Sequence, residues 1–160
     1  MFKSLKRVAK NATNLKTKVI FRIVFSETEI QDLVLDLNRV EQLFKKGIDS
    51  DDDVIGLYSA VTEQLSQGRG FGFGGDSGRK QKKAGEPIFL LDEGDFYRSF
   101  KVKILNDGFV IQADALKDDG TDLTRQYGKE ILGLTDKSRN EIIKEILPFV
   151  IEETRKAIRG

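Results

Sequence analysis

The sequence lacks both cysteine and histidine throughout its 160 residues. Without cysteine, a disulfide framework and thiolate chemistry are excluded. Without histidine, the chain lacks the commonest metal ligand and the commonest general base near neutral pH. Carboxylate pairs, lysine-based arrangements and Mg²⁺ held by acidic side chains remain as routes to catalysis, and residue spacing indicates none of them. We therefore expect a protein that is not an enzyme, with no catalytic residues, no metal and no cofactor.

Long apolar runs are also missing. Nothing in the sequence approaches the roughly 18 consecutive apolar residues that a membrane-spanning helix needs. The apolar patch at 19–25 is short, is interrupted by Arg22 and has no small-residue cleavage pattern, so a secretory signal is not expected. With 39% apolar residues, the chain fits a single soluble domain over 1–160 with no membrane partner.

Charge is unevenly distributed, although the formal net charge is only +1. Every charged residue before Glu27 is basic. Apolar residues such as Phe2, Leu5 and Val8 recur at steps of three and four, which predicts an amphipathic helical arm at 1–25 with its lysines in solvent. The basic face suits an anionic partner, and the alternative is an ordinary solvated face whose apolar stripe packs on the core.

A second helical region is predicted to follow the arm. The run at 26–29, Ser-Glu-Thr-Glu, fits a capping box that starts a helix, and Gly47 is suited to a left-handed stop. The acidic turn at 48–56 has alternating carboxylates like those of a calcium loop. We reject an EF-hand because Val54 and Ala60 stand where that loop needs glycine and a bidentate glutamate.

The segment at 66–86 is rich in glycine and basic residues, which predicts a long flexible loop. Its glycines formally match a dinucleotide fingerprint, but no strand precedes them and no helix follows. Two interpretations remain: a solvated loop without a partner, or a loop that is ordered against a neighbouring subunit or DNA. DNA is considered because phenylalanine rings placed between basic residues can stack on bases while the cations contact phosphates. The candidate residues for a subunit interface or a DNA channel are Arg69, Phe71, Phe73, Arg79, Lys80, Lys82 and Lys83.

The next block predicts a β-hairpin. Residues 101–104 alternate polar and apolar, Asn-Asp-Gly at 106–108 supplies the turn, and 109–113 returns along the sheet. Before the hairpin, Asp92 is expected to cap a short turn, and Phe96 and Phe100 are expected to face the core because they lie four residues apart.

A long C-terminal helix is predicted to begin at Thr135. Pro148 is expected to kink or split this helix near Ile146, because proline removes an amide donor and crowds the preceding turn. The fold class that follows is α+β: a small antiparallel sheet packed against the long C-terminal helix and N-terminal helices.

Two short runs, LLDEGDFYRSF at 90–100 and YGKEILGLT at 127–135, carry a family resemblance. The first resembles a motif of tail-completion and head–tail joining proteins of tailed bacteriophages, with Glu93 standing where the family pattern has Thr. The second, leading into the last helix, resembles the ending of related virion-morphogenesis proteins. The motif residues, to which we assign structural roles, are Leu91, Gly94, Asp95, Phe96, Tyr97, Ser99, Phe100, Tyr127, Gly128, Leu132, Gly133 and Leu134.

The resemblance implies a structural virion protein of the phage head–tail connector, neck or tail top, assembled in the host cytoplasm. It further implies a homo-oligomeric ring, a hexamer by analogy, around the channel through which genomic DNA leaves. Neighbours in the virion would be connector or portal-side proteins and the tail tube. The basic loop would reach either an adjacent subunit or the DNA in the lumen.

Two other functions stay open from the residues alone. One is a nucleic-acid-binding accessory protein that uses the basic arm and the Gly/Phe/Arg loop. The other is a hydrolase that uses Asp51, Asp53 or Asp95 with a metal, which requires that these carboxylates converge in space.

Overall fold

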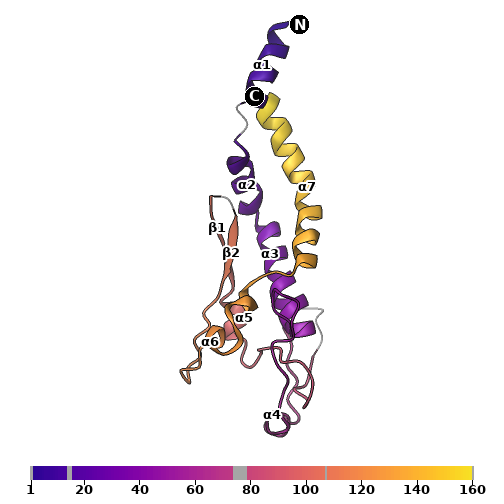
Figure 1. Cartoon of the computed structure of the whole chain (residues 1–160), viewed down its shortest axis with the longest axis vertical. Coiled ribbons are helices and arrows are strands. Elements are labelled where there is room, and N and C mark those ends of the chain that lie inside the picture. The colour runs from indigo at the N-terminus through magenta and orange to yellow at the C-terminus, as the bar shows by residue number, and fades with distance from the viewer. Residues whose placement is uncertain (1, 14–15, 74–78, 107, 160) are drawn as a thin grey trace.

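The structure is a computed structural model that describes residues 2–13, 16–73, 79–106 and 108–159. It is elongated (Figure 1). Helices α1 (Phe2–Thr13), α2 (Thr17–Ser26), α3 (Thr28–Asp36) and the π-helix η1 (Leu37–Lys46) follow one another along the molecule. The 24-residue helix α7 (Asp136–Arg159) runs back beside them and contacts α1, α2 and α3.

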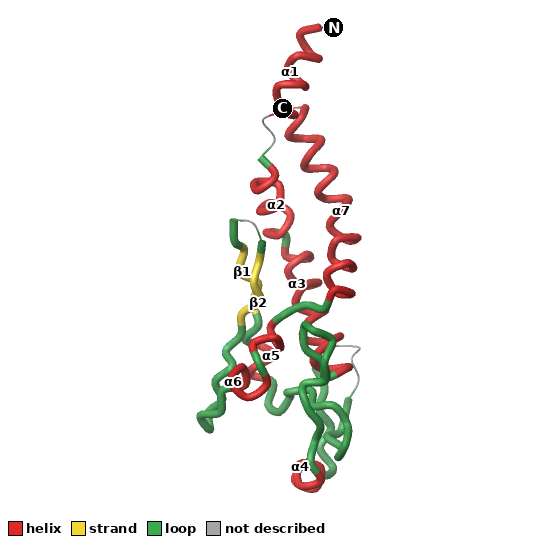
Figure 2. Tube along the Cα trace, viewed as in Figure 1, coloured by secondary structure: helices red, strands yellow, loops and turns green. Residues whose placement is uncertain are grey.

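The short elements are α4 (Ala60–Leu65), α5 (Asp95–Arg98), β1 (Lys101–Ile104), β2 (Phe109–Gln112), α6 (Leu123–Tyr127) and η2 (Lys129–Leu132). The two strands lie beside α2 and α3, and α4, α5 and α6 lie in the loop-rich part of the molecule away from α1 (Figure 2). Among the described residues, no helix is both long enough and apolar enough to cross a membrane.

The expected capping box at 26–29 does not form. A helix does begin at Thr28, but its N-cap Glu27 makes no side-chain capping bond. Ser26 belongs to the preceding helix α2, and its hydroxyl donates to the carbonyl of Arg22 at 2.6 Å. The prediction failed because the buried pair Ile20 and Val24 extends α2 to this point, where a serine hydroxyl bonds back to the fourth preceding carbonyl.

Helix η1 ends as the sequence predicts. Gly47 takes the left-handed conformation with φ +66°. Lys45 and Lys46 occupy the last turn, where positive charge interacts favourably with the carbonyl groups at the helix end. Two polar side chains of this helix, Asn38 and Gln42, are completely buried. They bind the backbone of the turn before α7, so the π-helix is held by contacts far away in sequence.

The hairpin forms with the predicted strands. Antiparallel pairing sets Val102 opposite Ile111 and Ile104 opposite Phe109. The Phe109 ring stacks on Phe25 of α2 with centroids 4.9 Å apart, and the hairpin packs mainly on α2 and α3. In Figure 1, α2 and α3 lie between the hairpin and α7.

Helix α7 starts directly after Thr135, within one residue of the predicted start, and it is not split at Pro148. The Thr135 hydroxyl accepts a hydrogen bond from the amide of Ser138 at 3.2 Å, which fixes the first turn. The helix continues through Pro148 to Arg159. Pro148 has no amide proton to donate to the carbonyl of Lys144. Both residues are exposed, so water can hydrogen-bond to this carbonyl instead.

The fold class is therefore α+β, with a two-stranded antiparallel sheet, N-terminal helices and a long C-terminal helix. The core joins these elements through a run of aromatic and aliphatic side chains. Phe96 and Phe100 both belong to it, as their spacing predicted.

Candidate functional site

The glycine-rich segment contributes more to the core than its sequence suggests. Phe71 and Lys80 exchange two backbone hydrogen bonds of 2.8 and 2.7 Å, which folds the segment back on itself. The Phe71 side chain is only 5% exposed and packs near the Phe89 ring. The prediction of a flexible loop did not foresee that Phe71 is a core residue, because the contact with Phe89 comes from a distant segment that sequence alone cannot place.

Phe73 also faces the protein. Its ring makes an edge contact with Tyr97 at a centroid distance of 4.9 Å, and the Arg39 guanidinium lies 5.4 Å from its centroid. Residues 74–78 lie outside the described residues. Both phenylalanine rings of the segment are thus engaged by the body of the protein, and stacking on nucleic-acid bases would require their displacement.

Two of the candidate lysines have structural partners. The Lys80 ammonium donates to the carbonyls of Phe44 and Lys45 at 3.0 and 3.1 Å, at the C-terminal end of η1. The Lys82 ammonium lies 3.3 Å from the Asp92 carboxylate and 4.2 Å from the centroid of Phe71. Burial lowers the pKa of both lysines. These two ammonium groups already have partners within the chain.

Asp92 has a different role from the expected one. The N-cap of α5 is Gly94, with φ +89° and no side-chain capping bond. The Asp92 carboxylate instead pairs with Lys82 and lies 3.8 Å from Arg69. The cap prediction failed because the folded-back segment brings cations to Asp92 that are distant in sequence.

The remaining loop cations, Arg69, Arg79 and Lys83, are exposed. Arg69 also lies over the Phe71 ring at 5.2 Å. The structure therefore divides the seven candidate residues into an inner set of Phe71, Phe73, Lys80 and Lys82 and an outer set of Arg69, Arg79 and Lys83. Arg79 and Lys83 can reach a partner without rearrangement, whereas Arg69 would first have to leave Asp92 and Phe71.

The first motif run is organised around the backbone of Phe89. The Tyr97 hydroxyl donates to the Phe89 carbonyl, and the Tyr58 hydroxyl accepts from the Phe89 amide at 3.2 Å. Burial raises the pKa of Tyr58 to about 12 and raises that of Tyr97 as well. Ser99 joins this run to the hairpin, because its hydroxyl donates to the Phe96 carbonyl and accepts from the Asp114 amide at 2.8 Å.

The other motif residues are also placed as parts of the fold. Leu91, Phe96, Phe100 and Leu134 are buried, and Leu132 and Tyr127 are half-buried. Asp95 pairs with Arg98 on the surface. Gly128 has φ +87°, and a Cβ on Gly133 would lie 2.5 Å from the Cβ of Ser50. The turn at 131–135 is held by Asn38, whose amide donates to the Ile131 and Gly133 carbonyls at 3.1 and 2.6 Å.

A cleft of about 670 Å³ opens beside the first motif run. Its lining includes the apolar side chains of Tyr58, Leu91 and Leu123. Acidic residues from two separate segments border it: Asp92, Glu93, Asp95, Asp114, Asp118 and Asp119. Lys82 and Lys117 are the basic residues of the lining. Sequence reasoning missed this cleft because only the fold brings 88–99 and 114–127 together.

Asp51 and Asp53, two of the carboxylates that the hydrolase alternative requires, lie in a local turn. The carboxylate of Asp49 accepts hydrogen bonds from the backbone amides of Asp51 and Asp53, and these bonds stabilise the turn. Within the described ranges, no group of three or more acidic side chains is arranged to hold a metal ion. The described surface offers two features that suit binding: exposed cations on the loop and arm, and an acid-bordered cleft.

Comparisons of this chain with protein-family models, with curated proteins and with solved structures found no match.

Proposed function

We propose that this chain is a structural virion protein of the tailed-phage head–tail connector, neck or tail top, where it forms a ring around the DNA channel and joins head to tail. The observation that carries the proposal is the shape of the subunit. Helices α1, α2 and α7 form an arm that extends from the loop-rich end (Figure 2) and leaves large apolar side chains exposed. The resemblance of 90–100 and 127–135 to tail-completion proteins suggests the kind of assembly.

The exposed apolar side chains are regularly spaced. On α7, Ile143, Leu147 and Ile151 recur every fourth residue and are 56%, 52% and 40% exposed. On α2, Val19 and Ile23 have the same spacing and are 48% and 41% exposed. Residues four apart share one face of a helix, so these are stripes on the arm. Apolar stripes of this kind favour a subunit whose arm is covered in an assembly.

The outer loop cations fit the same proposal. In a ring, Arg69, Arg79 and Lys83 would reach either the adjacent subunit or the DNA in the lumen. A channel through which DNA must slide cannot grip phosphates strongly, so the DNA affinity of the ring is expected to be weak and salt-sensitive. The protein would reside in the virion and be assembled in the host cytoplasm.

A nucleic-acid-binding accessory protein is the second candidate. The exposed cations of the arm favour it: Lys6, Arg7, Lys16, Lys18 and Arg22 are all exposed, and the sequence has no acidic residue before Glu27. The engaged rings of Phe71 and Phe73 count against base stacking by the loop. The ring proposal therefore ranks first.

The two candidates separate in one set of measurements on the purified chain. Native mass spectrometry and negative-stain microscopy detect rings, and fluorescence anisotropy measures DNA affinity across salt concentrations. The variant Arg69→Gln/Arg79→Gln/Lys83→Gln is compared with a surface control, Lys46→Gln/Lys129→Gln/Lys144→Gln.

The ring proposal predicts closed oligomers and weak DNA binding that is lost as salt rises. A monomer that binds DNA tightly at physiological salt would instead support the accessory protein. That binding should then be lost in the loop variant or in the arm variant Lys16→Gln/Lys18→Gln/Arg22→Gln, but not in the control.

A further inference from the structure

Helix α1 projects past the end of α7 (Figure 1). Its contacts with other helices are made mainly with α7, and the Asn11 amide donates to the Ile158 carbonyl at 3.0 Å. Lys6 and Arg7 are exposed. A helix of 12 residues is only marginally stable by itself in water. A helix in this position therefore gains stability from a partner that covers its remaining surface.

The sequence of α1 indicates the chemistry of that partner. Its apolar residues recur at helical spacing beside several cations, and it contains no acidic residue. Such a basic amphipathic helix suits an acidic groove with apolar walls, because the apolar face is buried while the cations meet carboxylates at the rim.

The acid-bordered cleft of the same chain has these properties. Among the described residues, no salt bridge involves Glu93, Asp114 or Asp118, and the acidic residues of the lining outnumber its two lysines. The lining also includes Leu116, which is 64% exposed, and the half-buried Tyr127. An exposed leucine inside an acidic cleft offers an apolar contact together with the charges.

We propose that α1 of one subunit docks in the acid-bordered cleft of a second copy of this chain. Charge complementarity identifies the occupant: a helix with cations and no acids, and a cleft with six acidic residues and two lysines in its lining. This inference rests on the proposed ring assembly and assigns the contact between its subunits.

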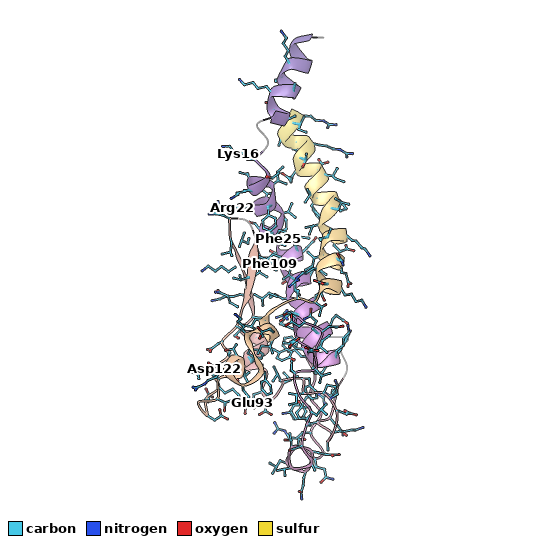
Figure 3. The ribbon with its side chains drawn as sticks, in the orientation of Figure 1. Lys16, Arg22, Phe25, Glu93, Phe109 and Asp122 are labelled. Carbon is cyan, nitrogen blue, oxygen red and sulfur yellow. The ribbon has the colours of Figure 1, made fainter. Side chains whose placement is uncertain are left out.

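The positions of the two surfaces determine the type of contact. Figure 1 shows α1 at one end of the molecule, and Figure 3 shows Glu93, which borders the cleft, in the loop-rich half away from α1. Docking therefore joins two different surfaces, α1 of one copy and the cleft of the next. Such a heterologous contact repeats from subunit to subunit and generates a ring if its rotation closes.

Charge exchange tests the contact in the full-length chain. Lys6→Glu/Arg7→Glu should weaken self-association about tenfold, and adding Glu93→Lys/Asp118→Lys should restore most of it. The matched control Lys101→Glu/Lys103→Glu makes the same change at two exposed positions of β1 and should leave association unchanged. Sedimentation velocity over a concentration series measures association, and circular dichroism checks that each variant is folded.

Disulfide trapping gives an independent readout, because the natural chain has no cysteine. The double variant Lys6→Cys/Asp118→Cys should form a ladder of linked oligomers on oxidation, with a 6–118 disulfide peptide detected by mass spectrometry. The control Lys6→Cys/Gln64→Cys places the second thiol on α4 and should give no such 6–64 ladder.

The outcomes separate this inference from the proposed function. A 6–118 linkage with rescue by charge exchange supports docking, even if the protein proves to have no role in virions. Rings that form without the linkage and without charge rescue overturn the docking and leave the ring proposal standing. A chain that stays monomeric and yields no linkage also overturns the docking.

Discussion

The side-chain carbonyl of Gln42 accepts a hydrogen bond of 3.0 Å from the amide of Thr135, a residue 93 positions later in the chain. Gln42 is completely buried, and its amide group also donates to the Gly133 carbonyl at 3.1 Å. One side chain thus joins the π-helix η1 to the turn that starts α7. This contact fixes where the long helix leaves the body, and with it the direction of the arm.

Replacing Gln42 with leucine is expected to destabilise the protein by about 1–3 kcal/mol, because the buried Thr135 amide loses its acceptor. Urea unfolding followed by circular dichroism measures the change. Gln67→Leu, at an exposed position, is the control and should change the free energy of unfolding by less than about 0.5 kcal/mol. Equal effects of the two substitutions would show that the Gln42 contact contributes nothing specific.

Gly47→Ala should be more damaging than Gly85→Ala, although both glycines have positive φ angles of 66° and 80°. A Cβ on Gly47 would lie 2.5 Å from the Ile88 carbonyl oxygen, whereas a Cβ on Gly85 would meet nothing within 4 Å. The Gly85 variant should lose only about 1 kcal/mol for its left-handed backbone. Thermal unfolding of both proteins tests this order, and a Gly47 variant as stable as the Gly85 variant would contradict it.

Ultraviolet titration should show that no tyrosine ionises normally in the folded protein. Burial raises the pKa of Tyr58 to about 12, and it also raises the pKa values of Tyr97 and Tyr127, the other two tyrosines of the chain. Because the folded-state pKa values exceed the unfolded value of about 10, the tyrosine contribution to stability is complete below pH 10 and declines above it. Absorbance of tyrosinate near pH 10 in native protein, equal to that in urea, would refute this expectation.

Methionine substitutions should separate the structural lysines from the exposed cations. Lys80→Met removes the ammonium that bonds the last carbonyls of η1 and should cost about 1 kcal/mol. Arg79→Met and Lys83→Met, at exposed positions, should change stability little and serve as controls. Chemical denaturation of the three variants measures the difference. Loss of stability in all three alike would mean that the division into inner and outer residues is incorrect.

Local patterns were sufficient to predict several elements. The alternation at 101–104 and the Asn-Asp-Gly turn predicted the hairpin, because strand and turn preferences act over a few residues. Gly47 and Thr135 likewise mark helix ends through local backbone geometry. These features depend on neighbours in sequence, and the sequence contains all the necessary information.

Other features depend on contacts between distant segments. Phe71 becomes a core residue only because the Phe89 ring is nearby, and Ser26 bonds back to Arg22 because α2 extends that far. The π-helix and its buried Asn38 and Gln42 require the turn at 131–135 as a partner. The acid-bordered cleft could not be predicted for the same reason, since its two segments meet only in the folded chain.

Electron microscopy of particles made after deletion of this gene from the genome that carries it tests the central claim most directly, with complementation by the intact gene as the control. The ring proposal predicts DNA-filled heads that accumulate apart from tails, or tails of abnormal length, and their correction by complementation. Normal, infectious tailed particles in the absence of the gene, or a genome that makes no particle, would contradict a structural role in the virion.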